Sequence, residues 1–223
     1  LKQVDYVLLE TNDGNMHLEQ AAQVMKAGKP MFIDKPIAGH LNEAIAIFEL
    51  SKKYNVPLFS SSSLRYTAAT QEIHNGKYGE VIGADSYGPD NSEPSHGDFT
   101  WYGIHAVEAL YAVMGTGCKE VSCASVPGTE VATGIWEGDR IGTFRANVKA
   151  KYVFGGTVFT KEGAFQMGSE IPYEALLQRI IGFFDTGVVP VTPQETIEIF
   201  TFMEAASVSK ARGGVPVMMS EVY

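Results

Sequence analysis

The stretch Met31-Phe32-Ile33-Asp34-Lys35-Pro36 decides how this chain is organised. It begins as a short apolar run, which is typical of a strand buried on both faces of a parallel sheet. It ends in an acid, a base and a proline, whose ring fixes φ and stops the strand. Ligands bind at the carboxyl ends of strands in open α/β sheets, so a lysine delivered there can serve as a catalytic cation. The alternative is an ordinary solvated turn, in which Asp34 and Lys35 have no function.

The sequence around this strand predicts a βαβ arrangement. Residues 4–9 form an apolar run that indicates another buried strand, and apolar residues recur at helical spacing over residues 18–25. After the central strand, a second helix carries one apolar face, and residues 56–59 predict a third strand; the residues on that face are Ala44, Ile45 and Phe48. Three strands and two helices in about sixty residues indicate half of a doubly wound sheet.

The pattern changes after residue 60. A short helix is predicted to end at Asn75-Gly76, a strand follows over residues 79–87, and the next helix is predicted from about Phe99 to Met114. Four β-rich runs with short polar connections come next, which implies mostly antiparallel pairing. They lie at roughly 118–126, 130–136, 140–149 and 151–160.

Two helices are predicted to close the chain. The first carries an apolar stripe from Tyr173 to Phe184 and ends at Gly187. The second starts at the capping box Thr192-Pro193-Gln194-Glu195 and runs to about Arg212. We therefore expect an α/β remnant at residues 1–60, followed at residues 61–223 by an α+β domain with one large, mostly antiparallel open sheet.

Composition argues against several classes of protein. Seventeen basic and 26 acidic residues give a net charge of -9, whereas non-specific nucleic-acid binding needs clustered Lys and Arg. The longest apolar runs are far below the roughly 18 residues of a membrane helix, and the first residues lack the basic start and apolar core of a signal peptide. We expect a cytoplasmic protein without a nucleic-acid or membrane partner.

Cys118 and Cys123 are the only two cysteines. An offset of five on a strand points their side chains to opposite faces, and we interpret both as buried thiols. Two cysteines without nearby histidines do not match any zinc-site spacing, so we expect no metal.

A second stretch with chemical potential is Asp98-Phe-Thr-Trp-Tyr-Gly-Ile-His105-Ala-Val-Glu108. If it is helical, Asp98, Trp101, His105 and Glu108 share one face, with Tyr102 beside them. Histidine titrates near neutral pH, so it can take a hydroxyl proton while a hydride leaves the same carbon. The alternative is a core histidine that is hydrogen-bonded to Glu108.

The order of these motifs resembles the glucose-fructose oxidoreductase / inositol dehydrogenase / MocA (Gfo/Idh/MocA) family of nicotinamide-dependent sugar and polyol dehydrogenases. Each motif is short, but their order and spacing are specific, and the resemblance covers essentially all 223 residues. The matching stretches are Ala-Gly-Lys-Pro-Met-Phe-Ile-Asp34-Lys35-Pro36 for the family's Glu-Lys-Pro strand, Arg65-Tyr66, Gly76-Lys-Tyr-Gly79-Glu-Val, and Gly103-Ile104-His105 for its catalytic-histidine helix.

This resemblance implies a site for NAD or NADP and for a sugar-like small molecule. Lys35 would orient the nicotinamide and the substrate hydroxyl, and His105 would be the general acid/base. The residues implied for the cofactor are Thr11, Asn12, His17, Asp34, Lys35 and Pro36, although His17, at a helix start, otherwise favours a structural role. The residues implied for the substrate are Arg65, Tyr66, Tyr102 and His105.

The resemblance also implies that part of the nucleotide site is missing. No Gly-x-Gly-x-x-Gly follows any predicted strand, so we expect residues 1–60 to be the C-terminal part of a Rossmann NAD(P)-binding domain. The phosphate-binding turn would be absent, and the chain would be inactive by itself. The C-terminal sheet would carry the substrate wall and the interface of a homo-oligomer.

Three departures from the family pattern affect the expected chemistry. Asp34 replaces a glutamate, and the stretch from Glu10 to His17 differs from the family's Thr-Pro-Asn-x-x-His turn, although its histidine falls in place. Trp101 stands where many members carry an aspartate four residues before the histidine. The third departure leaves Glu108, Asp98 or Tyr102 to orient His105.

Three functions remain open on this basis. The first is nicotinamide-dependent oxidation of a sugar-like or polyol secondary alcohol by hydride transfer, with Lys35 stabilising the developing alkoxide. The missing aspartate favours an alternative, a glycosidase or lyase that uses the same cofactor transiently. The third is a non-enzymatic oligomerising or sugar-binding module.

Overall fold

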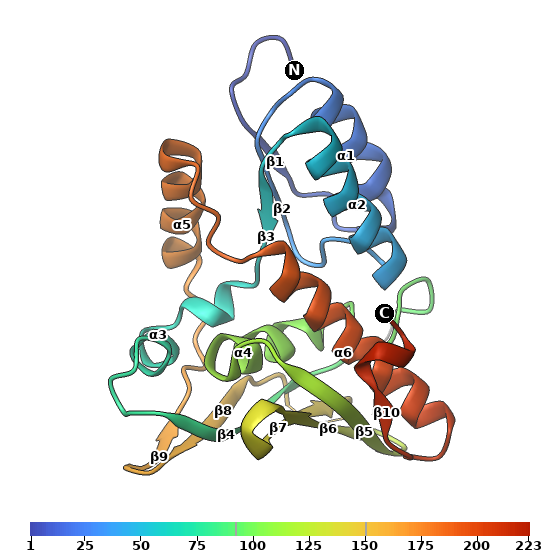
Figure 1. The fold of residues 1–223 in the computed structure, drawn as a ribbon, viewed down its shortest axis with the longest axis vertical. Helices are drawn as coiled ribbons and strands as arrows, with labels where there is room; N and C mark the ends of the chain where they lie inside the picture. The colour runs from blue at the N-terminus through green and yellow to red at the C-terminus, as the bar shows by residue number, and fades with distance from the viewer. Residues whose placement is uncertain (92, 150) are drawn as a thin grey trace.

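The computed structural model describes residues 1–91, 93–149 and 151–223, and within these ranges the chain forms two sheets (Figure 1). The first sheet has three parallel strands in the order β1-β2-β3, which are Val7–Leu9, Met31–Ile33 and Leu58–Ser60. The short helix η1 (Gly14–Met16) and the crossover helices α1 (His17–Lys26) and α2 (Leu41–Tyr54) connect these strands. The predicted parallel βαβ arrangement is confirmed.

Strand β2 is central in this sheet and is buried along its whole length. Successive side chains of a strand point to opposite faces. Met31 and Ile33 accordingly belong to the main core with α1 and α2, whereas Phe32 joins a second cluster with Phe59 and with apolar residues of α5 (Tyr173–Thr186). This burial on both faces explains why the sequence of β2 is a continuous apolar run.

The second sheet contains seven strands among the described residues, in the order β10-β5-β6-β7-β4-β8-β9. Adjacent strands pair antiparallel except β4 and β7, which run parallel. The expected fold class is confirmed, while β9 and β10 were not predicted. The strands are β4 (Val81–Pro89), β5 (Cys118–Val126), β6 (Thr129–Trp136), β7 (Arg140–Asn147), β8 (Gly155–Thr160), β9 (Gly163–Gln166) and β10 (Val217–Met218).

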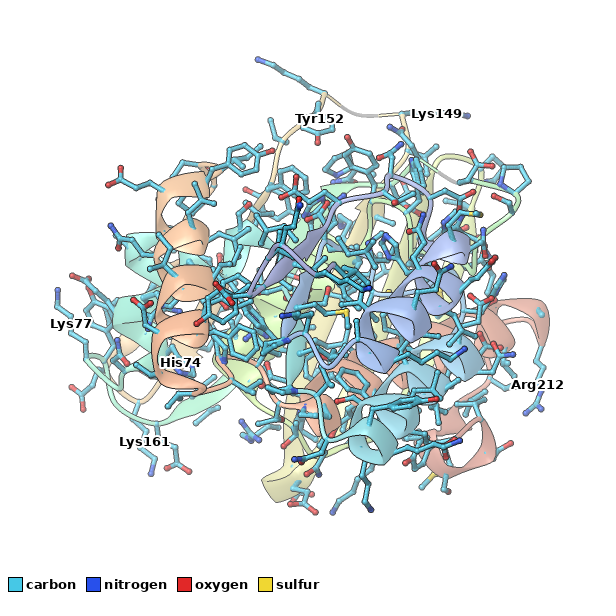
Figure 2. All side chains as sticks on the ribbon, turned by 90° about the horizontal axis from the view of Figure 1, so that it is seen from above. His74, Lys77, Lys149, Tyr152, Lys161 and Arg212 are labelled. Atoms are coloured by element: carbon cyan, nitrogen blue, oxygen red, sulfur yellow. The ribbon has the colours of Figure 1, made fainter. Side chains whose placement is uncertain are left out.

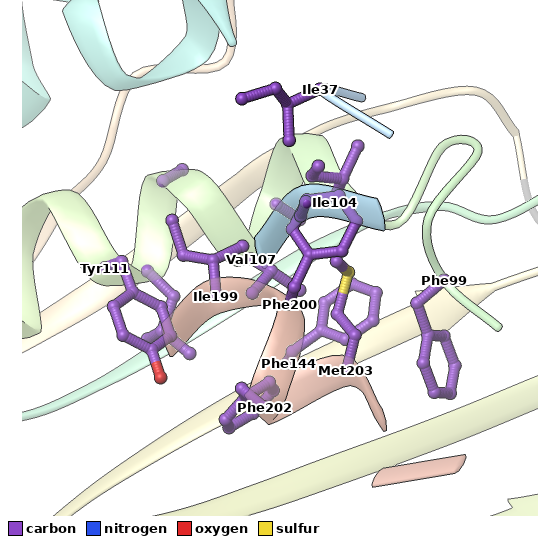
Figure 3. Close-up of a cluster of buried hydrophobic side chains, with 14 of the residues drawn as sticks. Ile37, Phe99, Ile104, Val107, Tyr111, Phe144, Ile199, Phe200, Phe202 and Met203 are labelled. Carbon is purple, nitrogen blue, oxygen red and sulfur yellow. The ribbon is translucent and has the colours of Figure 1, made fainter. Parts of the chain in front are cut away.

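Helices α4 (Ile104–Met114) and α6 (Pro193–Ala211) cover one face of this sheet (Figure 1). Their apolar side chains meet those of β6 and β7 in the main core, where Phe202 lies 6.0 Å from Tyr111 and 5.8 Å from Trp136 between ring centroids (Figure 3). Ile37, from the loop after β2, belongs to the same cluster (Figure 3). One continuous core therefore joins the two sheets. The remaining helices are η2 (Ser63–Tyr66), α3 (Ala68–His74), η3 (Glu137–Asp139) and η4 (Met219–Glu221).

The two cysteines differ from expectation in one respect. Both are free and buried, as predicted. They do not point to opposite faces, because the pairing of β5 with β6 shifts register between Cys118 and Glu120. Such an irregularity changes the alternation of side chains along a strand. Both thiols consequently lie on the side of β5 that α6 covers, where Cys123 accompanies Val121 in the core.

The helix predicted from Phe99 begins five residues later, at Ile104. Phe99 has a φ of +66°, which is incompatible with a right-handed helix. Asp98 and Trp101 therefore do not share a helical face with His105, as we had expected. Asp98 instead lies 2.7 Å from the ammonium of Lys210, and the Trp101 ring meets His96 edge-on at 4.8 Å.

A buried ion cluster connects the segment after β3 to both core helices. Arg65 of η2 donates through Nε to Glu108 of α4 at 3.0 Å and pairs through Nη2 with Glu195 of α6. The backbone N–H of Glu195 donates to the Thr192 hydroxyl at 3.1 Å, as a helix cap requires. The carboxylate of Glu195, in contrast, serves the ion cluster. Burying these charges is favourable only because they are paired, so the cluster fixes η2 against α4 and α6.

The start of α4 is held by Asp90, which is 5% exposed and accepts a hydrogen bond from the backbone N–H of Gly103 at 3.2 Å. Burial raises the pKa of Asp90 to about 6, against the opposing effect of this hydrogen bond. A folded-state pKa above the unfolded value means that the folded protein binds the extra proton. Stability is therefore greatest below pH 4 for this group and is lost as the pH rises through about 6.

We expect Asp90→Asn to remove this pH dependence, because asparagine keeps an acceptor for Gly103 without the buried charge. Relative to wild type, the free energy of unfolding of the variant should rise by about 2–3 kcal/mol between pH 4 and pH 7 and then stay constant. Urea unfolding at several pH values measures the difference. Parallel curves for the two proteins would show that Asp90 does not titrate in this range.

Candidate active site

Lys35 and His105 line the same cavity, although Lys35 follows strand β2 of the first sheet and His105 lies on helix α4, which covers the second sheet. The cavity has a volume of about 140 Å³. Lys35 Nζ lies 5.8 Å from the centroid of the Tyr102 ring, and that ring lies 5.7 Å from the ring of His105. The arrangement thus brings a cation and an imidazole to one small space. The complete lining consists of Asp34, Lys35, Ser63, Leu64, Tyr102, His105, Tyr152, Phe154, Ile171, Tyr173 and Leu176.

Lys35 reaches the cavity because β2 ends one residue before Asp34. The backbone N–H of Asp34 donates to the carbonyl of Leu9 at 2.9 Å, which continues the pairing of β1 with β2 up to the edge of the sheet. Pro36 then turns the chain away and is buried. Asp34 and Lys35 are both partly exposed and face the cavity, as expected for the carboxyl end of a parallel strand.

His17 connects the two loops at this edge and does not face the cavity. The ring is fully buried, with Nδ1 2.9 Å from the carbonyl oxygen of Pro36 and Nε2 2.8 Å from that of Thr11. Both ring nitrogens are therefore occupied by backbone carbonyls. These contacts are of the structural kind that its place at a helix start favours, and the cofactor contact implied for His17 stays a prediction. His17 sets the distance between the loops after β1 and β2.

The remaining residues implied for the cofactor lie on these same two loops. The hydroxyl of Thr11 donates to the side chain of Gln20 at 2.8 Å, and Asn12 is exposed. The sheet edge thus presents Thr11, Asn12 and the Asp34–Pro36 turn together.

The imidazole of His105 is hydrogen-bonded to a serine. Its Nδ1 lies 2.8 Å from Oγ of Ser62, which is buried in the segment between β3 and η2. Desolvation of the ring, followed by the charge of Lys35, lowers the pKa of His105 to about 3. The imidazole is therefore neutral over the physiological pH range. Among the described residues, none of the three groups considered as a replacement for the family's aspartate makes a hydrogen bond to this ring.

Glu108 is buried, and its carboxylate accepts hydrogen bonds from Ser62 and Arg65 and none from His105. Its Oε1 accepts the N–H of Ser62 at 2.9 Å, and its Oε2 accepts from Arg65. Burial raises the pKa of Glu108, and the charge of Arg65 opposes that effect. A core histidine bonded to Glu108, the structural alternative raised by the sequence, is therefore wrong.

Arg65 and Tyr66, which the resemblance implied for the substrate, lie outside the lining of the cavity. The guanidinium is fully engaged by two carboxylates, and Tyr66 packs in the cluster of Phe32 and Phe59 while its hydroxyl accepts from Ser61 at 3.2 Å. Both side chains are engaged within the protein, and their implied contact with the substrate stays a prediction. Tyr102 and His105, the other two residues implied for the substrate, do line it.

Sequence reasoning missed the aromatic wall of the cavity. Tyr152 and Phe154 precede β8, and their rings meet edge-on at 5.3 Å, with Tyr102 5.7 Å from Tyr152. Figure 2 shows Tyr152 at the edge of the molecule in that view. No local pattern marks these residues as functional, since they reach the cavity only through the pairing of β8 with β4. Ser62 and Ser63 were also missed, although they follow a buried parallel strand as Lys35 does.

The described part of the chain holds no cluster of three or more His, Cys, Asp or Glu side chains placed to bind a metal ion. In the same residues, no helix combines the length and the apolar character needed to cross a membrane.

Comparison with known proteins places these observations in a family. Residues 1–62 match the family model described as an oxidoreductase family with an NAD-binding Rossmann fold, GFO_IDH_MocA. The uncharacterized oxidoreductase YhhX of Escherichia coli is 26% identical over 111 residues, which cover 44% of this chain and 32% of YhhX. The match thus spans about a third of that relative.

Solved structures confirm the fold over nearly the whole chain. A probable dehydrogenase from Thermotoga maritima superposes with a TM-score of 0.85 at 21% identity, covering 99% of this chain and 82% of that protein. A myo-inositol dehydrogenase from Lactobacillus casei, solved with NAD(H) and myo-inositol, superposes with a TM-score of 0.79 at 14% identity, covering 96% and 77%.

The family match includes the Rossmann region itself, and the expected loss of an N-terminal nucleotide-binding half stays a prediction. The matched Rossmann region, residues 1–62, belongs to the Gfo/Idh/MocA family of oxidoreductases, and the fold of nearly the whole chain is similar to that of these solved dehydrogenases.

Proposed function

We propose that the whole protein is a nicotinamide-dependent oxidoreductase that acts on a sugar-like or polyol secondary alcohol. The single observation that carries this proposal is the cavity shared by Lys35 and His105. A cation and a neutral imidazole on one small cavity can both reach a single hydroxyl oxygen. Lys35 stabilises the negative charge that develops on that oxygen, which is the type of interaction that contributes most to many enzymatic rates.

The edge of the first sheet fits the nicotinamide end of NAD or NADP. Thr11, Asn12 and the Asp34–Pro36 turn lie at the carboxyl ends of β1 and β2, which is where doubly wound sheets bind dinucleotides. His17 holds the two loops at a fixed separation. When bound there, the nicotinamide accepts or supplies the hydride. Lys35 and His105 orient the reacting alcohol against it.

The aromatic wall of the cavity fits a polyol ring. Tyr102, Tyr152 and Phe154 present aromatic surface, while the hydroxyl and imidazole groups nearby supply hydrogen bonds. Sugar-like molecules have apolar C–H faces and polar edges, and such mixed pockets suit them. The Lactobacillus casei relative was solved with myo-inositol. This supports a substrate of the same chemical class.

We propose that residues 1–60 form the C-terminal part of the nucleotide-binding domain and residues 61–223 the substrate domain. The first sheet ends with β3 at Ser60, and the second sheet begins with β4. The sequence contains no glycine-rich phosphate turn after any of the three parallel strands. The diphosphate of the cofactor would therefore be held by residues outside this chain, and the chain would be inactive by itself.

Titration of NAD(H) and NADP(H) into the 223-residue chain tests this division. We expect little binding, because the nicotinamide end contributes only part of the affinity and the phosphate-binding turn supplies much of the rest. Isothermal calorimetry on the chain and on the whole protein measures the difference. Tight binding by the chain would contradict the proposed division. It would also exclude the third possibility raised by the sequence, a purely non-enzymatic module.

We expect Lys35→Ala in the whole protein to lower kcat for its alcohol substrate by about 100-fold or more, because the developing alkoxide loses its cation. Lys26→Ala, on the exposed last turn of α1, is the matched control and should change kcat by less than about twofold. Steady-state assays that follow the reduced nicotinamide measure both. If Lys35→Ala stays within about threefold of wild type, this mechanism is wrong.

One observation favours a second function, cleavage or elimination with transient redox. In the described structure no carboxylate supports the imidazole of His105, in contrast to the pattern of many family members. An enzyme of this kind returns the hydride to the same substrate, so its bound nucleotide stays in place during turnover. Labelled nucleotide that exchanges in every cycle supports the dehydrogenase, whereas nucleotide that never exchanges supports the glycosidase or lyase.

We also propose that the protein forms a homo-oligomer through the uncovered face of the second sheet. On that face Phe159 and Ile141 flank Gly83 on neighbouring strands, and they are 39% and 51% exposed. Tyr87, on the same face of β4, is 37% exposed. Large apolar side chains that line up across a sheet commonly mark an interface between subunits.

Ile141→Glu should therefore lower the molar mass of the protein in solution, because it places a charge in the proposed interface. Val188→Glu, at an apolar position just after α5 that is more exposed than Ile141, is the control and should leave the assembly unchanged. Sedimentation velocity at several concentrations measures the mass. A wild-type protein that is monomeric at micromolar concentration would contradict this interface.

A further inference from the structure

We propose that Ser62 holds His105 as the neutral tautomer with its hydrogen on Nε2, so that His105 donates a hydrogen bond to the substrate oxygen while Lys35 exchanges the proton. The catalytic part of this inference rests on the proposed function. The tautomer itself rests only on hydrogen-bond geometry, so it can be tested separately.

The hydrogen bonds of Ser62 determine the tautomer. Its Oγ accepts the backbone N–H of Leu64 at 3.2 Å and lies 2.8 Å from Nδ1 of His105. Within the described residues, no other hydrogen-bond acceptor lies within reach of this hydroxyl, and Ser62 is only 1% exposed. The hydroxyl must therefore donate to Nδ1, because a buried donor without a partner is costly. A nitrogen that accepts carries no hydrogen, so the ring hydrogen is on Nε2.

The surroundings of the ring disfavour a second proton. A carboxylate partner would accept from Nδ1–H and stabilise the imidazolium, but a serine hydroxyl that donates cannot do so. Asp98 is engaged by Lys210 at 2.7 Å, and Glu108 by Arg65 at 3.0 Å. Lys35 adds positive charge on the open side of the ring, which also opposes protonation.

This tautomer gives His105 and Lys35 different chemical roles. A neutral imidazole that carries hydrogen on Nε2 is a hydrogen-bond donor, and its exposed nitrogen has no lone pair for a proton. Lys35 carries the other basic nitrogen on the described wall of the cavity. In the direction of reduction, the ammonium of Lys35 would give its proton to the substrate oxygen as the hydride of the reduced nicotinamide reaches the carbonyl carbon, so that an O–H and a C–H bond form while the C=O π bond breaks. The amine that results takes a proton back from water, since Lys35 is partly exposed.

The tautomer can be measured in the chain labelled with ¹⁵N-histidine. Long-range ¹H–¹⁵N correlation spectra distinguish a ring nitrogen that carries hydrogen from one that does not, and His105→Gln assigns the signals. We expect Nδ1 of His105 without hydrogen, Nε2 with hydrogen, and no titration between about pH 5.5 and 8. A wild-type ring with its hydrogen on Nδ1 would overturn the inference.

Variants at residues 61 and 62 test the role of Ser62 as a positioning residue. Ser62→Ala removes the donor and should move part or all of the ring hydrogen to Nδ1. Ser62→Thr keeps a hydroxyl and should keep the wild-type spectrum. Ser61→Ala is the matched control, because Ser61 is an equally buried neighbour that contacts Tyr66 and Glu108 instead of His105. An unchanged spectrum in Ser62→Ala would show that the serine does not determine the tautomer.

The activity of the whole protein tests the catalytic part of the inference separately. Ser62→Ala should lower kcat by about tenfold with little change in KM, and Ser62→Thr should restore it. If the protein oxidises no alcohol, the proposed function fails, while the spectra still decide the tautomer. If the enzyme is active and Nδ1 carries the hydrogen, this inference fails and the proposed function stands.

Discussion

The buried pairing of Arg65 with Glu108 and Glu195 fixes the positions of three segments of this protein relative to one another. The three side chains come from η2, α4 and α6, and the last two helices form the centre of the core. Buried charges are tolerated only when they are paired, so removing Arg65 would leave two carboxylates without a partner. Because Arg65 lies three residues after Ser62, the same cluster positions the serine against His105. A structural ion cluster thus sets the geometry of a chemical site.

The candidate site lies between the first sheet and helix α4, and each of them supplies one of the two groups proposed for chemistry. Lys35 comes from the edge of the parallel sheet, and His105 comes from the helix that covers the antiparallel one. Their separation depends on the continuous core that includes Ile37, Ile104 and Phe200 (Figure 3). A small rotation of one sheet against the other would change that separation. Close packing of the core resists such a movement.

Much of the fold was predictable, because short-range patterns in the sequence follow directly from backbone geometry. The period of the apolar residues located α1, α2 and α5, the capping box at Thr192 located α6, and the run before Lys35 located β2. The errors occurred where a contact distant in sequence overrides the local pattern. The turn at Phe99 delays the start of α4, and the irregular pairing of β5 turns both cysteines toward α6. The parallel pairing of β4 with β7 likewise depends on residues far apart in the chain.

The sequence by itself determined that a lysine ends a buried parallel strand and that a histidine lies near the start of a later helix. Both conclusions need only the alternation and spacing of neighbouring residues. Only the tertiary structure decided what surrounds them. Ser62 and His105 are 43 residues apart, and Arg65 and Glu195 are 130 apart. No local pattern encodes such pairs, since they form only when the helices and sheets pack into one core.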